Sequence, residues 1–148
     1  MKRRYARVAL WLLLCSFVVV ACGDPASGPV PVTWGRDTCS HCQMALGDQR
    51  HAAQIRSAAR VEKFDDGGCA LAWQIQHPDV EVREFWMADE DDGRWIDART
   101  AHFRTGRRTP MDFGLGAISR AEADSIDFEA ALRRVKERLD GRAGGGAR

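Results

Sequence analysis

The sequence predicts an α+β fold made of two small ββαβ-type halves packed together. Three observations support this prediction. Short segments alternate apolar with polar residues, as strands of a half-buried sheet do. A longer apolar segment ends against a proline, as a helix does. Two stretches, residues 63–73 and 94–103, each lead from an aromatic strand through an acidic residue into an expected helix, which indicates a repeated unit.

The first half is expected to begin with a β-hairpin within residues 51–66. Ala53 and Ile55 alternate with polar residues, a short polar turn follows, and Val61 and Phe64 lie on the returning strand. This pattern predicts two antiparallel strands with one buried face.

A helix is expected to follow the hairpin at residues 69–77, which are rich in apolar side chains. Asp65 or Asp66 is placed to cap it near Gly67, because a short carboxylate accepts hydrogen bonds from the first free N–H groups of a helix. Pro78 is expected to end it.

The second half is expected to contain strands at 81–88 and 94–98, a short helical piece at 99–103 and a last strand at 113–119. The acidic segment 89–93 is interpreted as a hairpin turn. Its glycine comes one position too early for a calcium-binding loop, and no glutamate stands at the end of the segment.

A final helix is predicted at the C-terminal end of the domain. Ser119 and Glu122 have the spacing of a capping box. The apolar face of this helix repeats at helical spacing and consists of Phe128, Leu132, Val135 and Leu139.

The N-terminus has the pattern of a bacterial lipoprotein signal. A basic start precedes an apolar run, residues 8–21, that is too short for a comfortable membrane span. The run ends in small residues before Cys22, which predicts cleavage there and lipidation of Cys22, with acyl chains that anchor the protein without spanning the bilayer. We therefore expect a lipid-anchored protein of the cell envelope facing the periplasm. Gly23, in place of the aspartate that retains some lipoproteins at the inner membrane, favours the outer membrane.

The predicted organisation has four parts: signal peptide 1–21, lipidated cysteine and Pro/Gly-rich tether 22–33, folded domain 34–140, and disordered tail 141–148. Removing the signal peptide removes four of the 22 basic residues and none of the 21 acidic ones, so the mature chain carries a net charge of −3. The mature chain has no basic stripe, and this excludes nucleic acid as an expected partner.

The segment "CSHCQM", residues 39–44, is the candidate functional motif. Attachment of haem c requires a histidine directly after C-x-x-C, and Gln43 stands there instead. A structural zinc site needs four Cys or His ligands, and no second C-x-x-C exists, although Cys69 with His51 or His77 could complete a set.

A redox role for Cys39 and Cys42 is the alternative function that stays open. A thiol–disulfide oxidoreductase needs its first thiolate at a helix N-terminus, and the residues after Cys42 lack a sustained helical pattern. A structural disulfide between these cysteines would close a very small loop and stabilise the fold little.

Met44 favours a soft metal, because a thioether together with a thiolate suits Cu(I). Cys42 and Met44 are two residues apart and point the same way if the segment is extended. Four residues are candidates for a third ligand: Cys39, His41, His51 and Met111.

Four blocks of the chain resemble the NosL family in the order in which that family has them. They are the C-x-x-C-x-M stretch with the strand after it, "KFDDGGCALAW", "RWIDARTAHF" and "TPMDFGLGAIS". They cover most of residues 37–119, and the lipobox at Cys22 fits the family as well. One departure is Gln43, where many members have glycine.

This resemblance implies a non-enzymatic, copper-binding lipoprotein that delivers Cu(I) for the copper–sulfide centre of nitrous oxide reductase. The expected partners are the apo-enzyme or its maturation factors. By position, the resemblance makes Cys42 and Met44 the core copper ligands, with Cys39 and Met111 matching further family positions. His41 is retained as a candidate beside them.

The fold that the resemblance implies is similar to that of the organomercurial lyase MerB. A lyase of that kind would need two thiolates and a proton donor, for which Cys42, Cys69 and an aspartate are available. Nothing in their spacing requires this chemistry. Cys69 is instead expected to pack as a small hydrophobic residue at the start of a helix.

Overall fold

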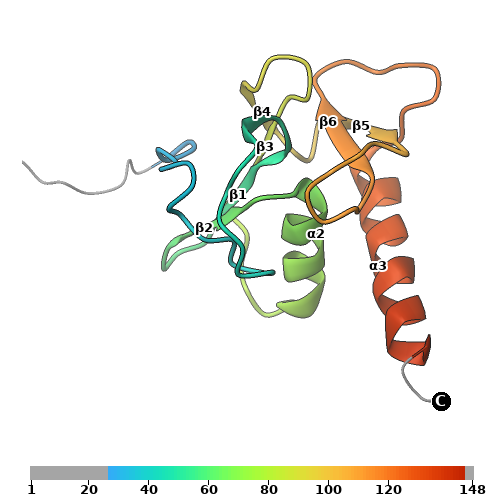
Figure 1. The fold of residues 1–148 in the computed structure, drawn as a ribbon, viewed down its shortest axis with the longest axis horizontal. Helices are drawn as coiled ribbons and strands as arrows, with labels where there is room; N and C mark the ends of the chain where they lie inside the picture. Colours follow the sequence, from blue (N-terminus) through green and yellow to red (C-terminus); the bar gives the residue numbers. More distant parts are fainter. Residues whose placement is uncertain (1–26, 146–148) are drawn as a thin grey trace, which may run out of the picture.

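Four antiparallel strands form the main sheet of the structure, a computed structural model that describes residues 27–145. They are β1 (Ala53–Arg56), β2 (Val61–Phe64), β3 (Glu84–Ala88) and β4 (Trp95–Asp97), in the order β2-β1-β3-β4 (Figure 1). The predicted hairpin, β1 and β2, is confirmed. Its turn is closed by the Ser57 N–H bonded to the Arg60 carbonyl at 3.0 Å.

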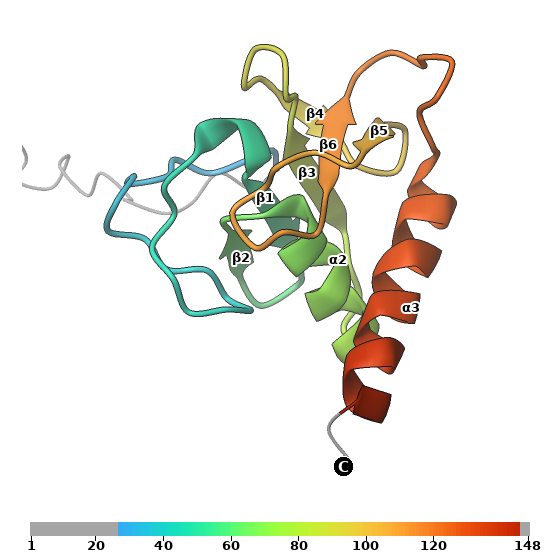
Figure 2. The same ribbon diagram turned by 45° about the vertical axis from the view of Figure 1, so that its right-hand side comes forward.

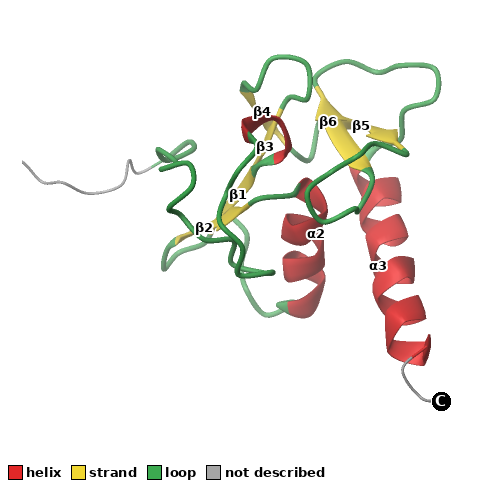
Figure 3. Cartoon of the chain, in the orientation of Figure 1, coloured by secondary structure: helices red, strands yellow, loops and turns green. Residues whose placement is uncertain are grey.

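The other elements are a two-stranded sheet, two α-helices and one 3₁₀ turn. They are β5 (His102–Thr105), β6 (Leu115–Ile118), α2 (Gly67–Gln76), α3 (Phe128–Gly145) and η1 (Gln49–His51). Helix α2 packs against β1, β2 and β6, and α3 lies beside it (Figure 2). Loops make up most of the described chain before β1 and between β5 and β6 (Figure 3). The α+β class is therefore confirmed.

Part of the predicted tether is docked on the domain. Val30 is buried, and its N–H and carbonyl bond to the side-chain amide of Gln54, each at 2.8 Å. The Gly28 N–H donates to Glu84 at 2.8 Å. Consequently Gln54 is fully buried although it lies on the face of β1 where the alternation predicts an exposed residue. The boundary of the folded part moves from residue 34 to about residue 28.

Asp66 is the N-cap of α2, as predicted, and it also holds a distant loop. Its Oδ1 accepts the N–H of Gly68 at 2.8 Å. Its Oδ2 accepts the hydroxyl of Thr109 at 2.6 Å and the N–H of Met111 at 2.9 Å. The side chain is completely buried, so this carboxylate depends on these three donors to replace water.

The same loop approaches the first turn of α2 so closely that only glycine fits. A Cβ placed on Gly68 would lie 2.1 Å from the side chain of Phe113. Helix α2 then ends at Gln76, and the proline two residues later agrees with the predicted end.

The second half differs from the predicted ββαβ unit. Residues 99–103, expected to be helical, form a turn followed by β5, and β4 pairs with β3 of the main sheet. Asp97 accepts the N–H of Arg99 at 2.9 Å, which is a turn hydrogen bond. Ala101 and Phe103 are then buried in alternation, which is the period of a strand.

The predicted capping box of the final helix is wrong. The N–H of Ser119 bonds to Asp89 and the carboxylate of Glu122 bonds to Arg104, so neither caps a helix. Helix α3 starts later, where Asp127 Oδ1 accepts the N–H of Ala130 at 2.8 Å.

The apolar face predicted for α3 is confirmed. Phe128 and Val135 are buried, and Leu132 and Leu139 pack against the core. The helix continues to Gly145, beyond the predicted domain end at residue 140. Its apolar face already packs the helix against the core, so a few more residues add to it at little cost.

The acidic segment 89–93 is the predicted hairpin turn. Asp89 N–H bonds to the Arg94 carbonyl at 2.7 Å, and Gly93 has a φ of 73°. The predicted signal peptide and Cys22 lie outside the described residues. Among residues 27–145, no helix is both long and apolar enough to cross a membrane.

We predict that Asp66→Ala lowers the free energy of unfolding by about 2–4 kcal/mol, because three buried donors lose their acceptor. Urea denaturation monitored by circular dichroism measures this change. The control is Asp79→Ala at an exposed position, which should change stability by less than about 0.5 kcal/mol. Equal stabilities of the two variants would contradict the role given to Asp66.

Candidate metal site

The cysteine motif folds into a tight hairpin rather than a helix. Thr38 and Ala45 form an antiparallel bridge, and the Cys39 N–H bonds to the Met44 carbonyl at 2.8 Å. The Ser40 N–H bonds to the Lys63 carbonyl at the same distance, which fixes the turn against β2. We call residues 38–45 the cysteine hairpin.

Gln43 closes this hairpin in a left-handed conformation, with a φ of 64°. Its N–H donates to the Cys39 carbonyl at 3.0 Å. Glycine adopts this conformation without steric cost, whereas other residues adopt it with strain. Position 43 thus has a backbone geometry that favours glycine, although this chain has glutamine there.

Helix α2 brings a third cysteine to the hairpin. Cys69 is in the first turn of α2, directly after the two glycines that follow Asp66. Neighbouring Asp65 fixes the chain just after the cysteine hairpin, because its Oδ1 accepts the Gly47 N–H at 2.7 Å. The segment 65–69 therefore places the hairpin and Cys69 relative to each other.

The sulfur atoms of Cys39, Cys42 and Cys69 lie within 4.8 Å of one another. All three are free thiols. Cys39 and Cys69 are fully buried, and Cys42 is half-buried. A three-coordinate metal with bonds of about 2.3 Å to thiolate sulfur has its sulfur atoms about 4.0 Å apart, so the three thiols need only a small contraction to bind one ion.

Hydrogen bonds prepare Cys39 to be a thiolate. The Cys69 thiol, as donor, lowers the pKa of Cys39 to about 4, and the backbone N–H groups of Cys42, Asp65 and His41 act in the same direction. Burial opposes this change. Donors that converge on one sulfur favour its charged form, which is the form that binds metals.

The other two cysteines have the opposite tendency. Burial raises the pKa of Cys42, and the charge on Cys39 adds to this effect. The hydrogen bond to Cys39 raises the pKa of Cys69 far above the usual range, and burial raises it further. Burial also raises the pKa of Asp65. The metal-free cluster therefore holds one thiolate and two thiols.

This distribution disfavours thiol–disulfide exchange. An attacking sulfur must be both ionised and accessible. Cys39 is ionised and fully buried, whereas Cys42 is accessible and has a raised pKa. Cys39 also lies in a hairpin and not at a helix N-terminus, which is the position the redox prediction requires.

Met44 extends outward from the cluster. It is one of two large apolar side chains exposed in the described part of the chain, with 54% of its surface accessible. The other is Trp34, which is 38% accessible. Its segment is joined to the chain just after the hairpin by a hydrogen bond from the Gly35 N–H to the Leu46 carbonyl at 2.8 Å. Trp34 is thus more exposed than a residue that covers a metal would be.

The remaining predicted ligands are arranged around the same end of α2. His41 is half-buried within the hairpin. Met111 is partly buried against the core, and its backbone is held at the start of α2 by Asp66. His51 is buried, and its Nδ1 has no hydrogen-bond partner among the described residues, yet it does not join the converging donors.

Cys69 packs in the core at the start of α2, as predicted. Its sulfur also joins the cluster, and the sequence motif alone did not place it there. Its spacing from the motif, 27 residues after Cys42, matches no metal-binding pattern. The only signal was the number of cysteines, because Cys69 is the third cysteine of the expected domain.

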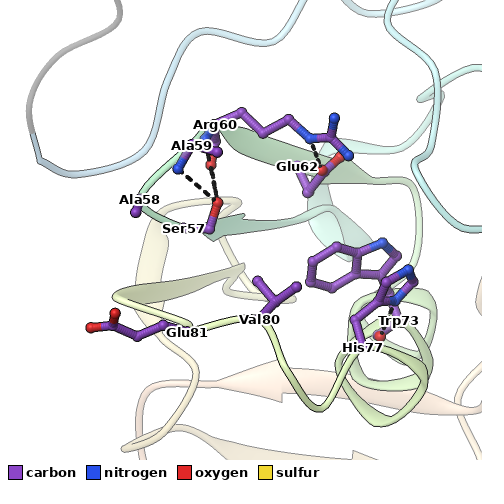
Figure 4. Close-up of a pocket in the computed structure, with 9 residues that line it drawn as sticks. All are labelled: Ser57, Ala58, Ala59, Arg60, Glu62, Trp73, His77, Val80 and Glu81. Atoms are coloured by element: carbon purple, nitrogen blue, oxygen red, sulfur yellow. Dashed lines mark hydrogen bonds and ion pairs between the residues drawn. The ribbon is translucent and has the colours of Figure 1, made fainter.

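An open pocket lies elsewhere and contains none of the predicted copper ligands. It is formed by the β1–β2 turn, the residues after α2 and the stacked rings of Trp73 and His77, whose centroids are 4.3 Å apart (Figure 4). The cysteine cluster is therefore separate from this pocket.

Three thiols beside an exposed thioether, on an α+β frame, form a donor set suited to a soft metal ion. No protein-family model matches the chain, and no curated protein matches it significantly by sequence. Among solved structures, the chain is similar to the copper chaperone NosL from Shewanella denitrificans, with a TM-score of 0.55 and 17% identity. The match covers 74% of this chain and 89% of that one. The NosL-like fold predicted from the motifs is confirmed.

We predict that Gln43→Val lowers the free energy of unfolding by about 1–3 kcal/mol, because a β-branched residue is strained at positive φ. Gln43→Gly should change it by less than about 1 kcal/mol, since the relief of strain offsets the entropy of glycine. Urea denaturation compares the variants, with Gln76→Val at the exposed end of α2 as the control. Equal tolerance of Val and Gly at position 43 would contradict the left-handed turn.

We predict that the metal-free protein gains stability from Cys39 as pH rises. The folded pKa, about 4, is below the ordinary value of 9.0, so this contribution is complete above pH 9 and is lost as pH falls through 4. The gap in unfolding free energy between wild type and Cys39→Ser should therefore widen with pH, by at most about 1.4 kcal/mol per pH unit. Anaerobic urea denaturation at several pH values measures it. A constant gap would show that Cys39 is not a thiolate.

Proposed function

We propose that this protein is a non-enzymatic Cu(I)-binding chaperone and that its metal site is the cluster of Cys39, Cys42 and Cys69 with Met44 at its edge. The convergence of the three sulfur atoms within 4.8 Å carries this proposal. Thiolate and thioether donors select soft ions, of which Cu(I) accepts two or three ligands. The likeness of the fold to a copper chaperone supports the same metal.

Zinc fits this site less well than copper. Structural zinc sites are closed by four ligands, usually Cys or His. Among residues 27–145, the converging donors are three cysteines, and no histidine or carboxylate joins them. Met44, two residues after Cys42, offers a thioether, which is a poor ligand for zinc.

The site is also suited to releasing its ion. Cys42 is half-buried and Met44 is exposed, so an incoming ligand can reach the ion from that side before the old ligands leave. A fully enclosed site would store the metal instead. The hairpin is therefore the side from which we propose that the copper is passed on.

We further propose that the copper is delivered for assembly of the copper–sulfide centre of nitrous oxide reductase. The four sequence blocks that resemble the NosL family support this client. We also propose that lipid on Cys22 anchors the domain to the periplasmic face of a membrane, which the lipobox pattern supports.

The test is an anaerobic titration of the reduced full-length chain with Cu(I) against a chromophoric chelator. We expect one tightly bound ion per chain. Cys42→Ser should weaken binding by at least about 100-fold, because the ion loses one of its three thiolate ligands. Ser40→Ala, in the same hairpin, is the matched control and should bind like wild type. Binding of wild-type affinity in a folded Cys39/Cys42/Cys69 triple serine variant would refute the site.

Delivery is tested with the loaded protein and copper-free nitrous oxide reductase. Copper should appear in the enzyme faster from the loaded chaperone than from an equal amount of Cu(I) held by the chelator. Equal rates would leave the protein a copper-binding chaperone for another client.

A further inference from the structure

The sulfur donors of the cysteine hairpin and α2 differ strongly in exposure. Cys39 and Cys69 have no accessible surface, Cys42 is half-buried, and Met44 is 54% accessible. The four residues therefore form a series from the core to solvent. A single ion cannot be bound symmetrically by all four sulfurs, because Cys39 is fully buried and Met44 is exposed to solvent.

Cys42 is connected to both ends of the series. Its sulfur is within 4.8 Å of the sulfur atoms of Cys39 and Cys69. The backbone N–H of Met44 also donates to the Cys42 sulfur, so Met44 adjoins this cysteine. The hairpin bond from the Cys39 N–H to the Met44 carbonyl, 2.8 Å, holds this arrangement.

We propose that Cu(I) occupies two positions that share Cys42. The inner position is formed by Cys39, Cys42 and Cys69 and holds the ion at rest. The outer position is formed by Cys42 and Met44 and presents the ion to the acceptor. This inference rests on the proposed function, and it adds an order of events to it.

The two positions have different strengths for a physical reason. The inner position offers three sulfurs that can each carry a negative charge, two of which are fully buried, where charges attract more strongly than in water. The outer position replaces two thiolates by one neutral thioether and is open to solvent. The ion is therefore bound more weakly there and exchanges more easily.

The step between the positions is a ligand exchange without change of oxidation state. The bonds from copper to the sulfurs of Cys39 and Cys69 break, a bond to the Met44 sulfur forms, and the bond to Cys42 is kept throughout. The Cys69 thiolate takes a proton from solvent and donates it in a hydrogen bond to the Cys39 thiolate. Cys42 stays a thiolate on the copper, and it takes a second proton from solvent only when the ion passes to the acceptor, which restores the metal-free arrangement. The copper remains Cu(I), and no oxidant or reductant is needed.

The acceptor removes copper from the inner position slowly, because only the Cys42 side of that position is accessible. A ligand from another molecule would have to reach an ion whose two flanking cysteines are fully buried. Met44 gives the ion a ligand on the accessible side before the acceptor arrives. In this scheme Met44 governs the rate of release, and Cys69 governs the strength of retention.

The first test separates rate from affinity with Met44→Leu, which keeps the size and apolarity of the exposed side chain and removes its sulfur. We expect the affinity for Cu(I) to change less than about threefold and transfer to excess bathocuproine disulfonate, followed by stopped flow, to slow at least about tenfold. Met87→Leu is the control, because this buried methionine of β3 is outside the series. Unchanged transfer in a Met44→Leu variant that still binds copper would overturn the proposal.

The second test locates the ion. With selenomethionine in place of methionine, X-ray absorption at the copper edge should show little Cu–Se scattering in the wild type. It should show a clear Cu–Se contact in Cys69→Ala, because the weakened inner position shifts the ion outward. The contact should disappear in Cys69→Ala/Met44→Leu.

The outcomes distinguish the two proposals. A full Cu–Se contact in the wild type, or none in a folded Cys69→Ala variant that binds copper, would overturn the two positions and leave the copper chaperone intact. Failure of the wild type to bind Cu(I) would overturn both. Met44→Leu alters only an exposed side chain, so the kinetic test remains decisive even where Cys69→Ala does not fold.

Discussion

The buried carboxylate of Asp66 determines how the candidate site is assembled. It is completely removed from water, and only its three hydrogen bonds make this burial tolerable. Those bonds fix the start of α2 and the loop of Thr109 and Met111 in one arrangement. Cys69 follows in the first turn of that helix, so its position is a consequence of how this carboxylate is satisfied. Asp65 extends the constraint to the hairpin segment through Gly47.

Local features were predictable from the sequence, and contacts between distant segments were not. Alternation predicts the β1–β2 hairpin, and the acidic pair before two glycines predicts the cap of α2. The predicted helix at 99–103 fails because its pairing with β6, about 15 residues later, outweighs a local pattern that is equally compatible with a turn and a strand. Cys69 could not be assigned to the site for the same reason, since only the packing of α2 against the hairpin brings its sulfur there.

The site balances two electrostatic requirements. Concentrated negative charge on sulfur favours binding of a soft cation, but charge in a buried position is unfavourable without compensation. The protein limits this difficulty by leaving Cys69 and Cys42 protonated until a cation arrives, while backbone N–H groups stabilise the one thiolate, Cys39. The electrostatic repulsion among three adjacent thiolates therefore arises only when the positive charge of a metal ion is present to offset it.

The docking of Val30 on Gln54 sets the working distance of the domain from a membrane. With the chain fixed from Gly28 onward, five residues lie between that point and Cys22. The six Cα–Cα steps from Cys22 to Gly28 span at most about 20 Å even when fully extended, which is less than the diameter of a small domain. If Cys22 carries lipid, the domain rests close to the bilayer surface and cannot search far into the periplasm. Under the proposed function, a client would then come to the membrane to collect its copper.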